Sequence, residues 1–403
     1  MTATPSWSTP AAGPPNSPSW SADGVRGVPA HPGAARGDLR AAPAGVRRFV
    51  FGGYTPTPDA PVLVLIGGQT AAGKTYAVDT ITARHDRLVP INGDELRAFH
   101  PRYRHIMRTE PLEMTGATGQ AAGAWIGRSL DYALEHRYSV LLEGTFRNPL
   151  MVVQTAQRFK KAGYQVEAVG LAVAERTSLL STVDRFLAAP ETAARWTHTP
   201  DHDLPYRMVP ATLQALEDSP DTYRLDVTNR AGDKLFTNIR TPTGEWADPT
   251  PGVAAASAKR ERDKPPSPQE ARDWLEAYTA TTRELAVRGH INATTWPTVE
   301  RLGGLAQTAA GIAFPHAPEA RQALSEHFER LAAIPHDTSR ELPHVPLPET
   351  APQTTAGPRR RRTGLSAARI DDPPAPTRSQ TPQAAEPPPQ HHPQRRPGHG
   401  PRP

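Results

Sequence analysis

The sequence predicts an α/β protein in which helices flank a parallel sheet, with a small C-terminal helical segment and disordered Pro-rich ends. Two observations support this prediction. The middle of the chain alternates short apolar, β-branched runs with stretches of helical periodicity, which is typical of parallel α/β sheets. The first apolar run also leads into a glycine-rich motif and then a helix, the order expected of a phosphate-binding loop.

The glycine-rich motif fits the Walker A template G-x-x-x-x-G-K-[ST] at every position: Gly68, Gln69, Thr70, Ala71, Ala72, Gly73, Lys74 and Thr75. Residues 61–66 before it predict a buried strand, and residues 76–85 after it predict a helix. The glycines let the backbone wrap phosphate groups, and the helix N-terminus supplies free N–H groups. Lys74 is then expected to reach the β and γ phosphates of ATP or GTP, and Thr75 to ligate Mg²⁺. The alternative is a chance glycine-rich turn, and the flanking strand and helix argue against it.

The elements after this motif continue the alternation of strand and helix. We predict strands at residues 88–91, 139–142 and 165–173, helices at residues 120–136, 151–161 and 176–188, and a β-hairpin formed by residues 223–227 and 234–238. Lys74, Asp94 and Glu143 each come just after a predicted strand. Because ligands of open α/β sheets bind at the carboxyl ends of strands, we interpret these three residues as one site of a P-loop kinase-type sheet.

The two ends of the chain differ from its middle in composition. Many of the 46 prolines among the 403 residues gather there, with few large apolar side chains. Such segments bury too little apolar surface to offset their ordering entropy, so residues 1–45 and 336–403 are predicted to be disordered. Between them we predict a P-loop kinase-type domain at residues 46–248, a linker at residues 249–266 and a small helical segment at residues 267–335, where apolar residues recur at helical spacing.

Composition also excludes several classes of protein. The sequence has no cysteine, which excludes disulfides and thiol chemistry. No stretch has the character of a secretory signal or the length of a transmembrane helix, so we expect a cytoplasmic protein that does not bind membranes. The net charge of +5 owes much to an arginine-rich tail that begins near Arg359. That tail has almost no aromatic residues for base stacking, so we interpret it as a solvated basic end rather than a nucleic-acid-binding module.

Several motifs of the middle segment together resemble the zeta toxin family of P-loop kinases. In order, they are GGQTAAGKT, INGDELRAFHPRY, LLEGTFRNP with Gln154 and Thr155 beyond it, VDRF, ARWTHTPDHD and VTNRAGDKLF. The Walker A loop alone would be unspecific, whereas GD-x-x-R-x-x-HP-x-Y and EGT-x-R together are much more specific. The resemblance covers residues from about 61 to 241 and nothing outside residues 46–248.

The resemblance implies transfer of the γ-phosphate of ATP or GTP, with Mg²⁺, to a sugar hydroxyl of a UDP-N-acetyl-hexosamine such as UDP-N-acetylglucosamine. It also implies a role for each matching residue. Lys74 and Thr75 are the Walker A pair, and Asp94 is the general base that takes the hydroxyl proton. Glu143 and Thr155 contact the nucleotide sugar. Arg185 and Arg195 clamp the transferring phosphate. An antitoxin protein is the partner that the family suggests.

Chemistry alone asks for the same residue types, because phosphoryl transfer needs positioning, charge neutralisation and a carboxylate near the acceptor hydroxyl. Without the resemblance, however, Arg185 would be expected to be a solvated helix residue and Arg195 a residue of a polar loop. Arg147 is left with two interpretations, a phosphate ligand or a cap on a strand end. Arg97 we interpret as structural.

One departure from the family concerns the helix before the EGT strand. Relatives often carry an acidic, sugar-contacting residue there, whereas residues 121–128 contain no carboxylate and the first one is Asp131. A kinase for another small acceptor, such as an antibiotic or a nucleoside, is therefore an alternative. A nucleotide-binding regulatory protein without transfer activity is another, although it would be expected to lack the base that Asp94 supplies.

Overall fold

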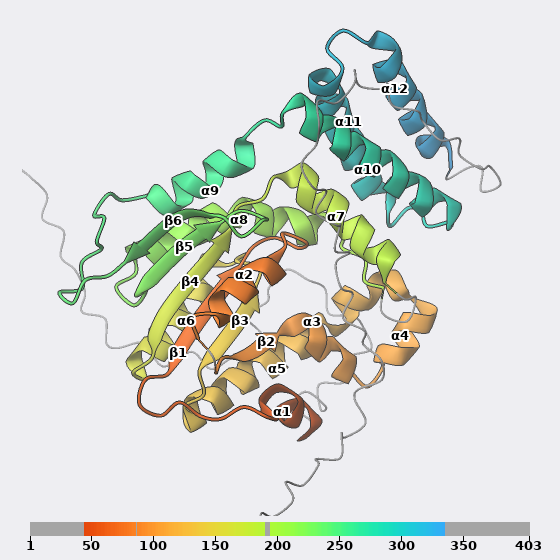
Figure 1. Ribbon diagram of the computed structural model, residues 1–403. Coiled ribbons are helices and arrows are strands. Elements are labelled where there is room, and N and C mark those ends of the chain that lie inside the picture. The colour runs from red at the N-terminus through yellow and green to blue at the C-terminus, as the bar shows by residue number, and fades with distance from the viewer. Residues whose placement is uncertain (1–43, 86, 190–193, 335–403) are drawn as a thin grey trace, which may run out of the picture. The chain divides into compact units, whose positions relative to one another are not determined.

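The computed structural model describes residues 44–85, 87–189 and 194–334. The segments predicted to be disordered, apart from residues 44 and 45, lie outside these ranges, as does the arginine-rich tail. Within the described ranges one sheet contains the strands β1 (Val62–Gly67), β2 (Val89–Asn92), β3 (Val140–Gly144), β4 (Gln165–Leu171), β5 (Arg224–Thr228) and β6 (Lys234–Ile239). Figure 1 shows this sheet with helices packed against it.

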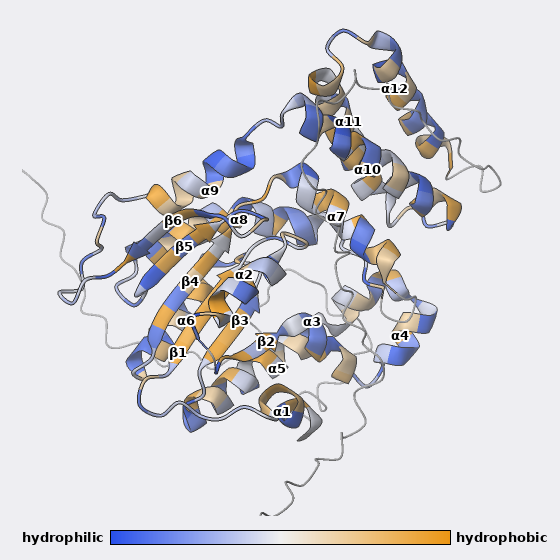
Figure 2. Ribbon diagram, in the orientation of Figure 1, coloured by the Kyte–Doolittle hydropathy of each residue, from blue (hydrophilic) through white to orange (hydrophobic). Residues whose placement is uncertain are grey.

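The order of the strands is β2-β3-β1-β4-β5-β6. Neighbouring strands from β2 to β5 pair in parallel, and β6 pairs antiparallel with β5 through the predicted hairpin. The prediction of an α/β fold with a mostly parallel sheet is therefore confirmed. Strand β1 is buried along nearly its whole length, and its apolar residues stand out in Figure 2. This is expected of a central strand that is covered on both faces.

Helices cover both faces of the sheet. One face packs against α1 (Ala44–Phe51), α5 (Met114–His136), α6 (Pro149–Lys161), α8 (Thr199–Asp218) and α9 (Val253–Asp263). The other face packs against α2 (Lys74–Thr82), through residues such as Ala77 and Ile81. Beyond β2 the chain forms α3 (Gly93–Leu96), α4 (Tyr103–Thr109) and short 3₁₀ turns at Arg97–Phe99 and Pro111–Glu113, and beyond β4 it forms α7 (Glu175–Ala188).

Helix α8 was not predicted from the sequence, because Pro205 and Pro210 lie inside it. Proline lacks a backbone N–H and clashes with the preceding turn, so it argues against a helix interior. The helix forms nonetheless because its inner side buries Val209, Leu213 and Leu216 in the main apolar core. Burial of side chains of this size contributes about 2 kcal/mol each. The three together only match the penalty of roughly 3 kcal/mol or more for each of the two prolines. The helix therefore also depends on the support of the surrounding core.

Helix α9 occupies the range that was expected to be a linker. Its residues Ala254 and Ala258 are buried against the core, and the helix packs on α8, β5 and β6. Its N-terminus is fixed by the Glu217 carboxylate, which accepts hydrogen bonds from the backbone N–H groups of Gly252 (2.9 Å) and Ala254 (3.5 Å). The segment therefore differs from a flexible connection because small apolar residues and a capping carboxylate hold it against the sheet.

The C-terminal segment forms α10 (Pro268–Val287), α11 (Trp296–Ala313) and α12 (Pro318–Ala333), as its apolar spacing predicted. Ser267 and Glu270 form a capping box at the start of α10. These helices share an apolar cluster with α7, which includes Val183 and Phe186. The Trp274 indole N–H also donates to the carbonyl of Arg176 at 2.9 Å. The segment, which we call the C-terminal bundle, is thus packed on α7.

None of the helices in the described ranges is long and apolar enough to span a lipid bilayer.

A buried histidine in the C-terminal bundle makes its stability depend on pH. His327 is fully buried, and its Nε2 lies 2.9 Å from the Thr282 hydroxyl. Burial, together with the charges of Arg330 and Arg283, lowers the pKa of His327 to about 4. In the unfolded chain His327 is protonated below about pH 6.5, whereas in the folded protein it is protonated only below about pH 4.

We expect this histidine to destabilise the fold progressively as the pH falls from about 6.5 to about 4, by roughly 3 kcal/mol at the acid end. The measurement is thermal unfolding of the wild type and of His327→Gln, whose side chain stays neutral, at pH 7.5 and pH 5. The wild type should lose more stability than the variant. Equal losses would contradict the assignment.

Candidate active site

The Walker A residues form the turn between β1 and α2. Gly73 precedes the first residue of α2 with a φ of 87°, a left-handed conformation that favours glycine. The first N–H groups of a helix have no acceptor one turn earlier in the helix, so the start of α2 has the geometry of an anion site. The Lys74 ammonium lies over the loop, with Nζ donating to the carbonyls of Gly68 (3.3 Å) and Gln69 (3.5 Å). Thr75 is exposed at the same end of the helix.

Parallel pairing brings the two predicted carboxylates beside this loop. Glu143, near the end of β3, lies in register with Ile66 of β1 on one side and with Asn92 of β2 on the other. Asn92 caps α3, since its side-chain oxygen accepts a hydrogen bond from the backbone N–H of Asp94 at 2.9 Å. This cap fixes the start of α3, and with it the position of Asp94 beyond the end of β2.

Guanidinium groups surround Asp94. Arg195 Nη1 lies 3.3 Å from one carboxylate oxygen, and Arg97 Nε lies 3.2 Å from the other. Burial would raise the pKa of Asp94, but the charges of Arg195, Arg185 and Arg97 outweigh burial and hold that pKa well below its usual range. The Asp94 side chain is nevertheless 40% exposed, so it remains open to a partner. Asp94 is therefore a carboxylate that stays ionised and accessible.

The charges of this group extend to Lys74. Burial lowers the pKa of Lys74, while the nearby Glu143 and Asp94 carboxylates oppose that effect and Arg185 adds to it. Burial likewise raises the pKa of Glu143, against the Lys74 charge. The structure thus brings together five of the predicted residues, and we call them the charged group: Lys74, Asp94, Glu143, Arg185 and Arg195.

Arg185 has an unused donor in this group. It extends from α7, and its Nη2 lies 3.5 Å from the Thr197 hydroxyl, a long hydrogen bond. Its Nε is buried and has no hydrogen-bond partner within the described residues. Buried polar atoms are almost always paired in native proteins. An unpaired guanidinium donor beside a phosphate-binding loop fits a site that receives an anionic ligand.

Two further predicted residues are not linked to the charged group. Thr155 is buried in α6, where its hydroxyl donates to the carbonyl of Met151 at 2.8 Å. Arg147 is exposed just beyond β3. Within the described residues, neither side chain is joined to the charged group by a hydrogen bond or an ion pair that the structure shows. Their roles as contacts of a substrate stay predictions.

Arg97, which we interpreted as structural from the sequence, connects Asp94 to helix α5. Its Nη1 donates to the carbonyl of Thr115 at 2.6 Å and to the hydroxyl of Thr118 at 2.9 Å, while its Nε contacts Asp94. No sequence pattern indicated the capping role of Asn92 beyond its place before the glycine. None indicated Arg230 either, which contacts the phosphate loop from the β5–β6 hairpin.

A buried chain of hydrogen bonds connects the loop to α7 and α8. The fully buried Gln69 side chain donates to the carbonyl of Val173 (2.9 Å) and to the Ser178 hydroxyl (3.1 Å). Ser178 in turn lies 2.9 Å from His202, whose other ring nitrogen lies 3.3 Å from Asp203. The second residue of the Walker A motif therefore anchors the loop to the helix that carries Arg185.

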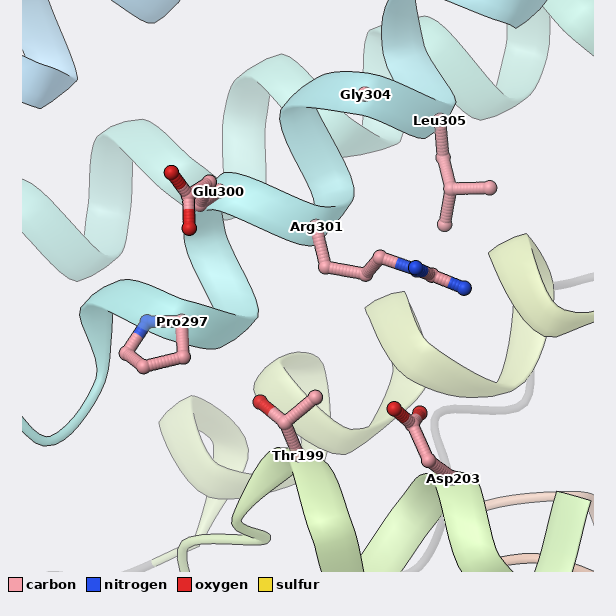
Figure 3. A pocket seen from close by; sticks show the side chains of 7 residues that line it. All are labelled: Thr199, Asp203, Pro297, Glu300, Arg301, Gly304 and Leu305. Carbon is pink, nitrogen blue, oxygen red and sulfur yellow. The ribbon is translucent and has the colours of Figure 1, made fainter.

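A pocket of about 490 Å³ opens elsewhere, between α8 and α11. Figure 3 shows Thr199 and Asp203 rising from α8, with Arg301 extending from α11 above them. Its lining includes no member of the charged group, and Arg301 is already paired with Glu175 at 2.8 Å. The charged group is therefore the candidate site, because an unpaired donor and an accessible carboxylate lie there beside the glycine-rich loop.

One family model and several distant relatives match this chain. The family model described as Zeta toxin matches residues 51–241. Toxin zeta of Enterococcus hirae is 26% identical over 193 residues, which are 46% of this chain and 66% of that protein. Toxin PezT of Streptococcus pneumoniae is 26% identical over 217 residues, which are 50% of this chain and 85% of that protein. The chain thus spans slightly less than two thirds of the length of toxin zeta.

Two solved structures are also similar to the chain. One comes from the PezAT chromosomal toxin–antitoxin system of Streptococcus pneumoniae, with a TM-score of 0.48 and 21% identity over 62% of this chain and 97% of that chain. The other is the complex of AvrRxo1-ORF1 and AvrRxo1-ORF2 with ATP, with a TM-score of 0.36 and 15% identity over 64% of this chain and 82% of that chain.

Removal of the Lys74 ammonium tests the phosphate loop. Lys74→Ala should weaken the binding of Mg-ATP at least about tenfold, because a charge-assisted hydrogen bond to phosphate contributes roughly 1.5–3 kcal/mol. The melting temperature should change little, since the hydrogen bonds that the Lys74 ammonium donates go to two loop carbonyls. Isothermal titration calorimetry measures the affinity, and Lys160→Ala, at an exposed lysine of α6, serves as the control. Equal affinities of the two variants would contradict the assignment.

Proposed function

We propose that this chain is a kinase that transfers the γ-phosphate of ATP or GTP to a sugar hydroxyl of a UDP-N-acetyl-hexosamine. The match of residues 51–241 to the zeta toxin family model supports the proposal. The observation that carries the proposal is the charged group. An accessible, ionised Asp94 lies among arginines, next to a loop built to hold phosphates. Phosphoryl transfer needs this combination of positioning, positive charge and a proton acceptor.

The phosphate loop is assigned to the nucleotide donor. Backbone N–H groups of residues 68–75 and the Lys74 ammonium would hold the β and γ phosphates. Thr75 is exposed at the start of α2, where its hydroxyl can ligate Mg²⁺. The cation, when bound with the nucleotide, neutralises charge on the phosphates. The loop residues themselves orient the γ-phosphate toward the carboxyl end of β2, where Asp94 lies.

Asp94 is assigned the role of general base. A carboxylate with a pKa as low as that of Asp94 is a weak proton acceptor while the arginines face it. The same arginines are suited to phosphate oxygens, which they bind in a bidentate manner. When Arg185 and Arg195 turn to the transferring phosphate, Asp94 loses their charge and its pKa rises. The arrival of the phosphate thereby makes Asp94 a stronger base at the moment when the acceptor hydroxyl needs one.

Arg185 and Arg195 are assigned to the clamp on the transferring phosphate. The unpaired Nε of Arg185 supplies a donor that no protein group uses within the described residues. Arg195 contributes through the nitrogen that contacts Asp94 in the structure. Charge on the equatorial oxygens of a loose transition state is what such guanidinium groups neutralise.

The residues assigned to the acceptor lie near the end of β3 and on α6. Glu143 and Thr155 are assigned to the nucleotide sugar, and Arg147 to a phosphate of the substrate or to the end of β3. Helix α5 offers no carboxylate between residues 121 and 128, so it cannot pair an acetamido N–H or a sugar hydroxyl in the manner of relatives that carry one. This observation favours a second candidate, a kinase of the same mechanism for another small acceptor such as an antibiotic or a nucleoside.

An antitoxin protein is proposed as a partner. The proposal rests on the relatives alone, one of which was solved as part of a toxin–antitoxin system.

The purified full chain should be incubated with γ-labelled ATP or GTP, Mg²⁺ and a panel of UDP-sugars, nucleosides and aminoglycosides. We expect label on UDP-N-acetylglucosamine or a close relative, identified by mass spectrometry as one added phosphate on the sugar. Transfer only to a nucleoside or an antibiotic would support the second candidate. Nucleotide binding with no transfer to any acceptor of the panel would contradict both kinase assignments.

Asp94→Asn tests the base, because asparagine keeps the shape and hydrogen bonding but cannot accept the proton. Turnover should fall at least about 10²-fold, the usual size of a general-base contribution. Nucleotide affinity should stay within a few-fold, since Asp94 is assigned to the acceptor. Asp131→Asn is the matched control, since Asp131 is an exposed carboxylate of α5 paired with Arg158. A variant that keeps its turnover but needs more Mg²⁺ would instead identify Asp94 as a metal ligand.

A further inference from the structure

The turn between β5 and β6 is a rigid structure that lies against the phosphate loop. The Asn229 side-chain oxygen accepts hydrogen bonds from the backbone N–H groups of Ala231 (2.9 Å) and Asp233 (3.0 Å). Gly232, at a φ of 88°, takes a left-handed conformation and lies beside Tyr76 of α2. A turn fixed in this way holds Arg230, the residue after Asn229, in one orientation.

Arg230 reaches from this turn to two other elements. Its Nη1 donates to the carbonyl of Ala71, in the phosphate loop, at 2.7 Å. Its Nη2 donates to the Ser181 hydroxyl, on α7, at 3.1 Å. The stem of the side chain packs on the loop as well, since a Cβ added to Gly73 would lie 3.1 Å from Arg230 Cγ. One side chain thus contacts the loop at two points and α7 at a third.

Arg230 contacts the loop at a residue whose backbone conformation is unfavourable. Ala71 has a φ of 59°, in the left-handed region that residues with a Cβ rarely adopt. Its carbonyl is the one that Arg230 holds. A hydrogen bond from a charged donor to that carbonyl favours the left-handed conformer over its extended alternatives.

The second contact links the loop to the proposed phosphate clamp. Ser181 lies one helical turn before Arg185 on α7, so the two side chains emerge on the same side of the helix. Burial lowers the pKa of Arg230, while Tyr76 and Asp184 oppose that effect, and the guanidinium remains a cation near neutral pH. Its hydrogen bonds therefore keep their charge-assisted strength.

We propose that Arg230 is a positioning residue, which holds the phosphate loop in its nucleotide-binding shape and fixes it relative to α7, the helix that carries Arg185. The inference rests on the proposed function for the statement that the loop binds nucleotide. The ordering of the loop by Arg230 follows from the contacts alone.

The variants are chosen to separate positioning from stability. Arg230→Gln removes the charged fork and keeps a polar side chain, and Arg230→Lys keeps the charge but can serve only one of the two acceptors well. The matched control is Arg240→Gln. Arg240 follows the same hairpin and also donates to backbone carbonyls, those of Thr222 (2.8 Å), Ser219 (2.8 Å) and Gly244 (2.7 Å), with no contact to the loop among its hydrogen bonds.

The first measurement is the affinity for Mg-ATP and Mg-GTP, by calorimetry on the full chain. Arg230→Gln should bind about 10- to 100-fold more weakly than the wild type, the range expected for loss of charge-assisted hydrogen bonds. The affinity of Arg230→Lys should lie between those of Arg230→Gln and the wild type. Arg240→Gln should bind as the wild type does, even if its melting temperature drops. Wild-type affinity in Arg230→Gln overturns the proposal, whatever its stability.

The second measurement needs no nucleotide. Hydrogen–deuterium exchange in peptides that cover residues 68–75 should be faster in Arg230→Gln than in the wild type, and unchanged in Arg240→Gln. If the wild type binds neither nucleotide, the proposed function fails, and exchange alone decides the inference: faster exchange supports ordering by Arg230, and equal exchange overturns it. If Arg230→Gln does not fold, Arg230→Lys and Ser181→Ala give the same two comparisons.

Discussion

Parallel pairing of β2, β3 and β1 is the constraint on which the site depends. Because the three strands run in one direction, their carboxyl ends lie at one edge of the sheet, and the residues that follow each strand meet there. The register is equally important. A slip by one residue would carry Glu143 to the opposite face of the sheet, away from the loop. The apolar strand residues that fix this register therefore set the geometry of the charged side chains.

The carboxylates and the cations of the charged group stabilise one another. Ions buried in a protein are unfavourable unless opposite charges lie close to them. Here the carboxylates of Asp94 and Glu143 stabilise the same cations that a bound phosphate would engage. The site can consequently hold several positive charges without a ligand, and a phosphate that enters replaces one set of anionic partners with another. Such an exchange brings the reacting groups together without exposing any of them as an unpaired buried ion.

The sequence predicted the parts of this molecule that local patterns encode. The strands, the phosphate loop and the helices of the C-terminal bundle follow from apolar periodicity and glycine placement, and Asp94 and Glu143 follow from their positions after strands. Helix α8 was missed because its prolines oppose a helix locally, while its burial is a tertiary effect. Arg230 lies 159 residues from the carbonyl that it contacts, and no short-range pattern reports such a pair. The role of Thr155 rests on resemblance alone, and Arg147 keeps both of its interpretations.

The packing of the C-terminal bundle on α7 also has a consequence for the order of events during synthesis. The Trp274 indole, which donates to the Arg176 carbonyl in the first turn of α7, is 98 residues downstream of its partner. At the pace of a ribosome, about 5–20 residues per second, that interval lasts about 5 to 20 seconds. Throughout it, apolar residues of α7 such as Val183 and Phe186 lack the partners that the C-terminal bundle supplies to their cluster. The region that matches the family model, residues 51–241, therefore ends before the residues that complete the packing of α7, and its boundary does not coincide with the boundary of the packed structure.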